Sequence, residues 1–165
     1  LRPIRPEDEP QHRAFLERLD PEDIRLRVFY SRRHIEHSEL ARLTQIDYAR
    51  EMAFIATRSG PDAEETLGTV RAVVDPDNED AEFGVIVRSD LKGSGLGHRL
   101  MRKMIDHLRE RGTRRLVGTV LRENRGMLEL AHALGFQETV NPSDPGDHDT
   151  RYVALDLQTP AGPPP

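Results

Sequence analysis

Three glycines at alternate positions, Gly93, Gly95 and Gly97, lie in the segment LKGSGLG between an apolar, strand-like run and a helix-like run. Such a turn directs free backbone amides and the positive end of a helix dipole to one point, which is an arrangement that binds phosphate groups. Glycines also occur in turns for steric reasons alone. The residues therefore predict either an anion site or a tight turn.

Two familiar phosphate-binding loops do not fit this segment. A Walker loop needs Lys and then Ser or Thr after its last glycine, whereas His98 and Arg99 follow Gly97. A dinucleotide fingerprint needs a third glycine where His98 stands and an acidic residue at the end of the next strand, which ends instead in Leu121 and Arg122. If the loop binds an anion, it does so in another kind of site.

Composition excludes several other kinds of chemistry. The chain has no Cys, so it has no disulfide, thiolate metal site or cysteine nucleophile, and we expect a reducing compartment. His34 and His37 could share a helical face, but further ligands are missing, so we expect solvated histidines and no metal. The basic segment Ser31–His34 is either a solvated loop or a substrate or phosphate contact.

The overall charge and hydropathy limit the classes of binding partner that we expect. The net charge of -5 and the sequence pI of about 5.8 give no global basic field, which argues against a dedicated nucleic-acid binder. No apolar run approaches the roughly 20 residues that span a membrane, and the first residues carry no apolar signal core. We expect a cytoplasmic protein with neither nucleic acid nor membrane as partner.

The elements that position the loop follow from hydrophobic spacing. The segment before the loop, residues 81–87, reads as a strand, and residues 96–112 read as a helix with apolar positions four apart. We expect further strands at residues 1–6, 52–58, 66–74, 114–121 and 152–157, and further helices at 7–19, from Asp20, at 38–46 and at 124–136. This order predicts an α/β chain of the α+β type, with one twisted, mixed and mostly antiparallel sheet and helices on both faces.

The chain length predicts one domain, over residues 1–157. Residues 158–165, QTPAGPPP, form a proline-rich tail or linker. The start at Leu1 and this tail favour a domain excised from a larger multidomain chain.

The loop and its flanks resemble motif A of the GNAT superfamily, the acyl-CoA-dependent N-acetyltransferases, whose loop reads Gln/Arg-x-x-Gly-x-Gly/Ala. Lys92 stands at the Gln/Arg position, which keeps a cation but loses a bidentate contact. Residues 81–87 match the superfamily's fourth strand, and residues 123–136, ENRGMLELAHALGF, match the following motif. Residues 2–10, with this later motif, are most similar to the protein-acetylating branch often fused to acyl-CoA synthetase-like domains. The resemblance covers residues 1–157 and implies a splayed fourth strand.

The resemblance implies coenzyme A as the ligand of the loop. The pantetheine arm would lie along the fourth strand like an added strand, held by backbone groups of Ile86 and Val87. Gly84 is consistent with a bulge that splays this strand. Asn124 would contact the far end of the cofactor. The phosphates would be held by Lys92 and by the amides of Gly93, Ser94, Gly95, Leu96, Gly97 and His98.

The resemblance also implies the chemistry. A lysine amine, with a pKa of about 10.4, must lose a proton before it attacks a thioester, so a base is required. Glu82 matches the catalytic glutamate of protein-acetylating relatives; a solvated surface glutamate is the alternative. Burial beside Phe83 would raise the pKa of Glu82. Ala131 stands where many relatives have a tyrosine acid, so we assign no general acid, and Tyr152 is a distant substitute. Without Cys, direct attack is favoured over an acyl-enzyme.

These expectations converge on a protein lysine acetyltransferase that uses acetyl-CoA. By analogy, its partner would be an AMP-forming acyl-CoA synthetase. One alternative is an enzyme that acetylates a small-molecule amine in an enclosed pocket. Another is a non-catalytic acyl-CoA sensor, which the missing tyrosine and Lys92 favour and Glu82 opposes.

Overall fold

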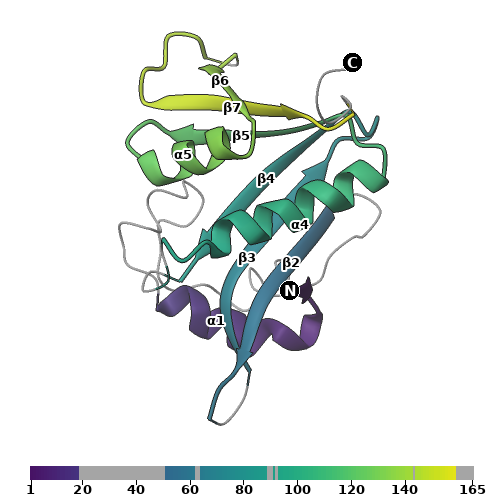
Figure 1. Cartoon of the computed structure of the whole chain (residues 1–165), viewed down its shortest axis with the longest axis vertical. Helices are drawn as coiled ribbons and strands as arrows, with labels where there is room; N and C mark the ends of the chain where they lie inside the picture. The colour runs from purple at the N-terminus through teal and green to yellow at the C-terminus, as the bar shows by residue number, and fades with distance from the viewer. Residues whose placement is uncertain (19–50, 62–63, 89–90, 92, 143, 159–165) are drawn as a thin grey trace.

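A computed structural model describes residues 1–18, 51–61, 64–88, 91, 93–142 and 144–158. These residues form a seven-stranded sheet in the order β1-β2-β3-β4-β5-β7-β6 (Figure 1). All neighbouring strands are antiparallel except β4 and β5, which are parallel. The strands are β1 (Arg2–Pro3), β2 (Glu51–Ser59), β3 (Glu64–Val74), β4 (Asp80–Val87), β5 (Arg115–Leu121), β6 (Gln137–Val140) and β7 (Thr150–Asp156).

Helices cover both faces of this sheet. The described helices are the short η1 (Pro6–Asp8), α1 (Glu9–Glu17), α4 (Leu96–Glu110) and α5 (Arg125–Ala133). The α4 helix buries Leu100, Met104 and Leu108, which lie four residues apart on one side of it. These side chains pack with the alternate residues of β2, β3 and β4 in the main hydrophobic core. The predicted fold class is confirmed.

The opposite face of the sheet is covered by α1. Its Phe15 and Leu16 are buried, and His12 lies within electrostatic range of Arg71 on β3. Arg71 lies between Val70 and Ala72, which both belong to the main core with α4. Because side chains alternate along a strand, α1 and α4 lie on opposite faces.

Two hydrogen bonds of Asn78, which we call the Asn78 pin, join the two halves of the sheet, β1–β4 and β5–β7, at one end. The turn between β3 and β4 places Asn78 so that its amide donates to the Arg111 carbonyl at 3.0 Å and accepts from the Thr113 hydroxyl at 2.7 Å. These bonds join the start of β4 to the segment that leads into β5. The two strands then pair only from Asp80–Glu82 with Arg115–Val117. Beyond these residues β4 and β5 diverge as a fork (Figure 1).

Some expectations about the elements are corrected. The pairing of β3 with β4 is regular through Gly84, so the bulge expected there is absent. A register shift occurs in a different strand pair, between β2 and β3 at Ala56/Thr57. The β6 strand was not predicted. Gln158, placed in the tail, donates its side-chain amide to the Thr113 carbonyl at 2.6 Å.

Several predicted features lie outside the described residues. These are the helices expected from Asp20 and at 38–46, the segment Ser31–His34 with His37, the loop cation Lys92, and the tail from residue 159. In the described part of the chain, no helix is long and apolar enough to cross a membrane.

Candidate functional site

The glycine loop after β4 has the backbone that an anion site requires. Gly93 and Gly95 have positive φ angles of 82° and 87°, and a Cβ added at either residue would meet nothing within 4 Å. Both glycines are therefore required by conformation, and their surroundings are open. Gly95 caps α4, and the Arg99 N–H donates to its carbonyl at 3.2 Å. The N–H groups of the three residues between Gly95 and Arg99, which are Leu96, Gly97 and His98, come before the first hydrogen bond of the helix. They are the free donors at the helix start.

Two members of the predicted loop have another role. The Ser94 N–H donates to the Leu91 carbonyl at 3.1 Å, so this amide closes the turn and does not fit the phosphate contact expected of it. Gly97 is close to α5, since an added Cβ would lie 3.3 Å from Leu130 Cδ2 and 3.8 Å from Val87 Cγ2. Gly97 therefore allows α4 to approach α5 and β4.

Beyond the fork, no described residue pairs with the edge of β4 that faces β5. At the two ends of β4, the Asp80 carbonyl accepts from Asp75 and the Arg88 N–H donates to Leu67, so even-numbered residues direct their backbone groups toward β3. Because this direction alternates along a strand, Val85 and Val87 present N–H and C=O groups to the open edge. The expectation for Val87 agrees with this geometry, whereas the backbone of Ile86 faces β3. Val85 was not predicted.

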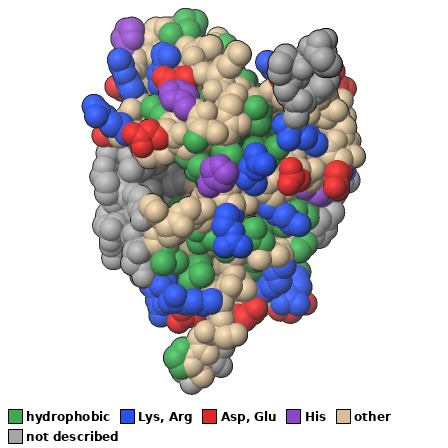
Figure 2. All heavy atoms as spheres, in the orientation of Figure 1, with side chains coloured by type: hydrophobic (Ala, Val, Ile, Leu, Met, Phe, Trp, Pro, Cys, Tyr) green, Lys and Arg blue, Asp and Glu red, His purple; other side chains and the backbone are tan. Residues whose placement is uncertain are grey.

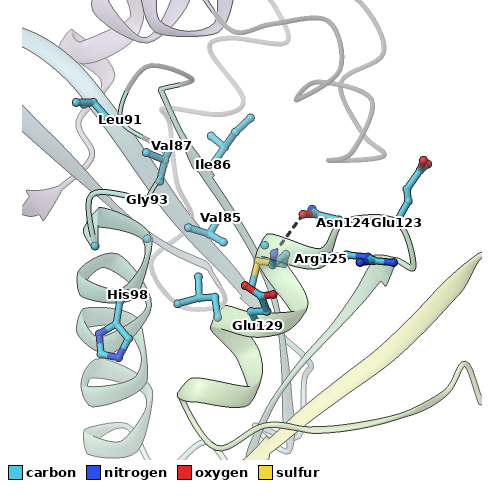
Figure 3. A pocket seen from close by; sticks show the side chains of 15 residues that line it. Val85, Ile86, Val87, Leu91, Gly93, His98, Glu123, Asn124, Arg125 and Glu129 are labelled. Carbon is cyan, nitrogen blue, oxygen red and sulfur yellow. Dashed lines mark hydrogen bonds between the residues drawn. The ribbon is translucent and has the colours of Figure 1, made fainter.

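A cleft of about 620 Å³ lies in the fork, between the end of β4, the glycine loop and the start of α5 (Figure 3). Asn124 is the N-cap of α5, and its Oδ1 accepts from the Met127 N–H at 3.2 Å. This bond fixes the carboxamide at the rim of the cleft, where only its N–H₂ group is left to donate to a ligand. The lining residues are Val85, Ile86, Val87, Leu91, Gly93, Gly95, Gly97, His98, Glu123, Asn124, Arg125, Gly126, Met127, Glu129 and Leu130.

Basic side chains lie on the outer face of α4, the helix that begins at this cleft. Figure 2 shows Lys and Arg side chains gathered along the outer face of α4, beside the hollow between α4 and α5. The exposed members on α4 are Arg99, Arg102, Lys103 and Arg109. Asp106 and Glu110 of α4 are exposed as well, so the cations are in excess on this helix and give a chain of negative net charge a locally positive surface, which would attract an anionic ligand.

Glu82 lies at the closed end of the fork, in the last residue pair of β4 with β5, opposite Val117. Its side chain is exposed, which contradicts the burial expected beside Phe83. Phe83 is buried because it points to the other face, toward α4 and α5. In the described part of the chain, the Glu82 side chain makes no hydrogen bond or ion pair. Its carboxylate is therefore available to an incoming group.

Tyr152 lies on the same face as Glu82. It pairs with Thr119 on β5, two residues after Val117, the partner of Glu82. Partial burial raises the pKa of Tyr152, Arg115 opposes this shift, and the charges of Asp80 and Glu82 add to it. Tyr152 is thus close enough to Glu82 for the carboxylate charge to affect the pKa of the phenol. The phenol is protonated at neutral pH. No sequence pattern predicts that these two residues lie close together, because they belong to strands far apart in the chain.

The structure therefore brings most predicted ligand contacts into one cleft and places Glu82 just beyond its closed end. Leu96 packs partly against the core and leaves its amide at the loop. The contributions of Met127 and Leu130 were missed, although their spacing in the helix 124–136 indicates one shared face. Among the described residues no group of three or more His, Cys, Asp or Glu side chains is placed to hold a metal ion.

Comparisons with known proteins agree with this architecture. The sequence model of the acetyltransferase (GNAT) family matches residues 12–136. An acetyltransferase of Pseudomonas aeruginosa, PA5475, is 33% identical over 144 residues, which cover 87% of this chain and 77% of that protein.

Two solved structures share the fold. The GNAT domain of S. lividans PAT superposes with a TM-score of 0.82 at 23% identity, over 94% of this chain and 88% of that one. Salmonella typhimurium yncA, solved with its cofactor acetyl-CoA, superposes with a TM-score of 0.75 at 20% identity, over 99% of this chain and 96% of that one.

Proposed function

The chain belongs to the acetyltransferase (GNAT) family, and from this premise we propose that it transfers an acetyl group from acetyl-CoA to the side-chain amine of a lysine on a protein. The observation that carries the proposal is the fork between β4 and β5. There a strand edge with no partner among the described residues leads from a loop of free amides to the carboxylate of Glu82. These are the parts that an acyl donor and an amine acceptor require.

The cleft fits acetyl-CoA along its length. The pyrophosphate would bind the amides at the start of α4, while the cations on the outer face of α4 draw the anion in. The pantetheine amides would bond to the open backbone groups of Val85 and Val87, as an added strand does. Asn124 would donate its remaining N–H₂ group. Acetyl-CoA bound to Salmonella yncA, which has this fold, supports the assignment.

The proposed reaction is a direct transfer with Glu82 as base. The lysine ammonium gives a proton to the Glu82 carboxylate, and the neutral nitrogen attacks the thioester carbonyl. An amide at the open edge of β4 would polarise the carbonyl oxygen as charge develops on it. The new C–N bond forms as the C–S bond breaks. The attacking nitrogen gives up its second proton to water. The departing thiolate, whose thiol has a pKa near 8.5, takes up a proton from water, so that one proton remains on Glu82 and is later released.

A protein acceptor is favoured by the exposure of Glu82 and by the similarity to the GNAT domain of S. lividans PAT. A lysine on a folded partner can reach an exposed carboxylate at the surface of the sheet, whereas an enclosed site suits a small amine. We propose an AMP-forming acyl-CoA synthetase as the partner.

Two measurements test this proposal. Calorimetry of acetyl-CoA binding examines the cleft, and acetylation of a purified acyl-CoA synthetase examines the acceptor. Binding with acetyl-lysine formation is the expected result. Binding with transfer only to small amines would point to the alternative acceptor. Binding with no transfer to any acceptor would indicate a sensor, and no binding would contradict the donor assignment.

A further inference from the structure

The closed end of the fork is marked by the close approach of an aromatic ring to a glycine. Phe83 and Gly118 directly follow the last residue pair of β4 and β5, which is Glu82 with Val117. A Cβ added at Gly118 would lie 2.6 Å from Phe83 Cε1 and 2.8 Å from Cζ. No real Cβ approaches an aromatic carbon this closely, so the ring occupies the space of a side chain at position 118.

Space, rather than backbone conformation, requires glycine at this position. The glycines with positive φ are Gly93, Gly95, Gly112 and Gly135, and Gly118 is not among them. Any residue could adopt its backbone, but only glycine leaves room for the ring.

The ring also packs against Phe136, which lies in the segment that follows α5. Phe83 is 9% exposed and meets Phe136 in a T-shaped contact with centroids 5.5 Å apart. Phe136 is buried, and its N–H donates to the Ala131 carbonyl at 2.9 Å. The ring is therefore confined between Gly118 and Phe136.

The polarity of the cleft would direct the acyl group of the donor toward this ring, which lies two residues before Val85, a residue that lines the cleft. The glycine loop, which would hold the phosphates, follows the C-terminal end of β4, so the thioester must point toward the start of β4. The residues there are Glu82 and Phe83, whose side chains lie on opposite faces of the sheet. An amine activated by Glu82 would arrive from one face, and the acyl chain would extend toward the other.

We propose that the Phe83 ring, seated in the side-chain space of Gly118, closes the fork and restricts the donor to a short acyl group. Phe83 is then a specificity-determining residue. This inference rests on the proposed function, because it needs an acyl-CoA in the cleft. A pocket that ends at a rigid ring discriminates by about tenfold or more for each added methylene.

The test compares acetyl-, propionyl- and butyryl-CoA by kcat/KM, in wild type, Phe83→Leu and Gly118→Ala. Wild type should favour acetyl-CoA, and Phe83→Leu should raise the butyryl-to-acetyl ratio about tenfold. Gly118→Ala pushes the ring off its seat and should lower kcat/KM for every donor. Adding Phe83→Leu to Gly118→Ala should restore part of that loss, because the smaller side chain makes room for the methyl group.

Phe54→Leu is the matched control. Phe54 is also a buried ring of the main core, but it packs against His107 of α4, away from the fork. This variant should lose stability and keep the donor ratio of wild type. Equal use of acetyl- and butyryl-CoA by wild type would overturn the inference without any variant, and so would an unchanged ratio in Phe83→Leu. Wild type that transfers nothing from any donor would overturn the proposed function and this inference with it.

Discussion

In the proposed reaction Glu82 is the base, and its carboxylate has no hydrogen bond or ion pair to another described residue. Its neighbour Asp80 is different, because Arg115 Nε and Nη2 each lie 2.8 Å from its oxygens. Of these two carboxylates on one face, only Glu82 can accept a proton without breaking an ion pair. This contrast supports our proposal that Glu82, and not Asp80, is the base.

Replacing Glu82 by Gln should lower kcat for acetyl transfer by about 10²- to 10⁴-fold, since the amide cannot accept a proton from the lysine. The Kd for acetyl-CoA should stay near that of wild type, because Glu82 does not line the cleft. Steady-state kinetics and calorimetry check the two halves. Asp77→Asn, at an exposed carboxylate in the β3–β4 turn, is the control and should retain wild-type kcat. Wild-type turnover in Glu82→Gln would remove Glu82 from the mechanism.

His12 should make the fold sensitive to acid. Burial lowers its pKa to about 4 from its ordinary value of 6.5; Arg71 on β3 adds to the shift and Asp8 in η1 opposes it. The folded state therefore disfavours the charged imidazole. The unfolded chain binds the proton between pH 6.5 and 4, so stability is lost as the pH falls through this window. At pH 5 the loss from His12 is about 2 kcal/mol relative to pH 7.

Urea unfolding at pH 7 and pH 5 measures this effect. His12→Leu should remove about 2 kcal/mol of the difference between the two pH values. His98→Gln, at an exposed histidine, should leave that difference unchanged. If His12→Leu and wild type lose the same stability on acidification, the burial of a neutral His12 is contradicted.

The helices and strands around the cleft show which features a sequence pattern can predict and which it cannot. The spacing of Leu100, Met104 and Leu108 predicted α4, and the apolar run predicted β4, because each pattern is local. The end of β4–β5 pairing depends on contacts between segments far apart in sequence, as does the fit of Gly118 against Phe83. The β6 strand has four mostly exposed residues and thus lacks the apolar alternation that identifies a strand.

Replacing Gly95 by Ala should strain a backbone with φ of 87° and destabilise the fold by about 1 kcal/mol. It should also raise the Kd for acetyl-CoA, because the amides that follow Gly95 would lose their alignment. Gly112→Ala is a closely matched control: its φ is 78°, but it lies past the other end of α4. Thermal unfolding should shift alike in both variants, while calorimetry should detect weaker binding only in Gly95→Ala. If the two variants had the same Kd for acetyl-CoA, the role of the loop in binding would be contradicted.

The relative position of the two halves of the sheet depends on the Asn78 pin at one end and on the divergence of β4 and β5 at the other. One half carries the glycine loop and Glu82, and the other carries α5 and Tyr152, so their relative position sets the width of the cleft. The two bonds of Asn78 hold the halves together where β4 and β5 begin.

Asn78→Gly keeps the positive φ of 56° accessible but removes both bonds. It should destabilise the fold by about 1 to 3 kcal/mol and weaken acetyl-CoA binding, although Asn78 lies outside the cleft. Urea unfolding and calorimetry measure the two effects. Asp77→Asn in the same turn should change neither. An Asn78→Gly variant with reduced stability but wild-type affinity would show that the pin does not set the cleft.

The acceptor is the central claim for the molecule as a whole, and a competition experiment tests it directly. The wild-type enzyme is incubated with labelled acetyl-CoA, a purified AMP-forming acyl-CoA synthetase and an excess of small amines, including spermidine and free amino acids. Mass spectrometry then locates the label. We predict acetyl groups on lysine side chains of the synthetase, at sites that stay unlabelled with Glu82→Gln. Label found only on the small amines would contradict the protein acceptor.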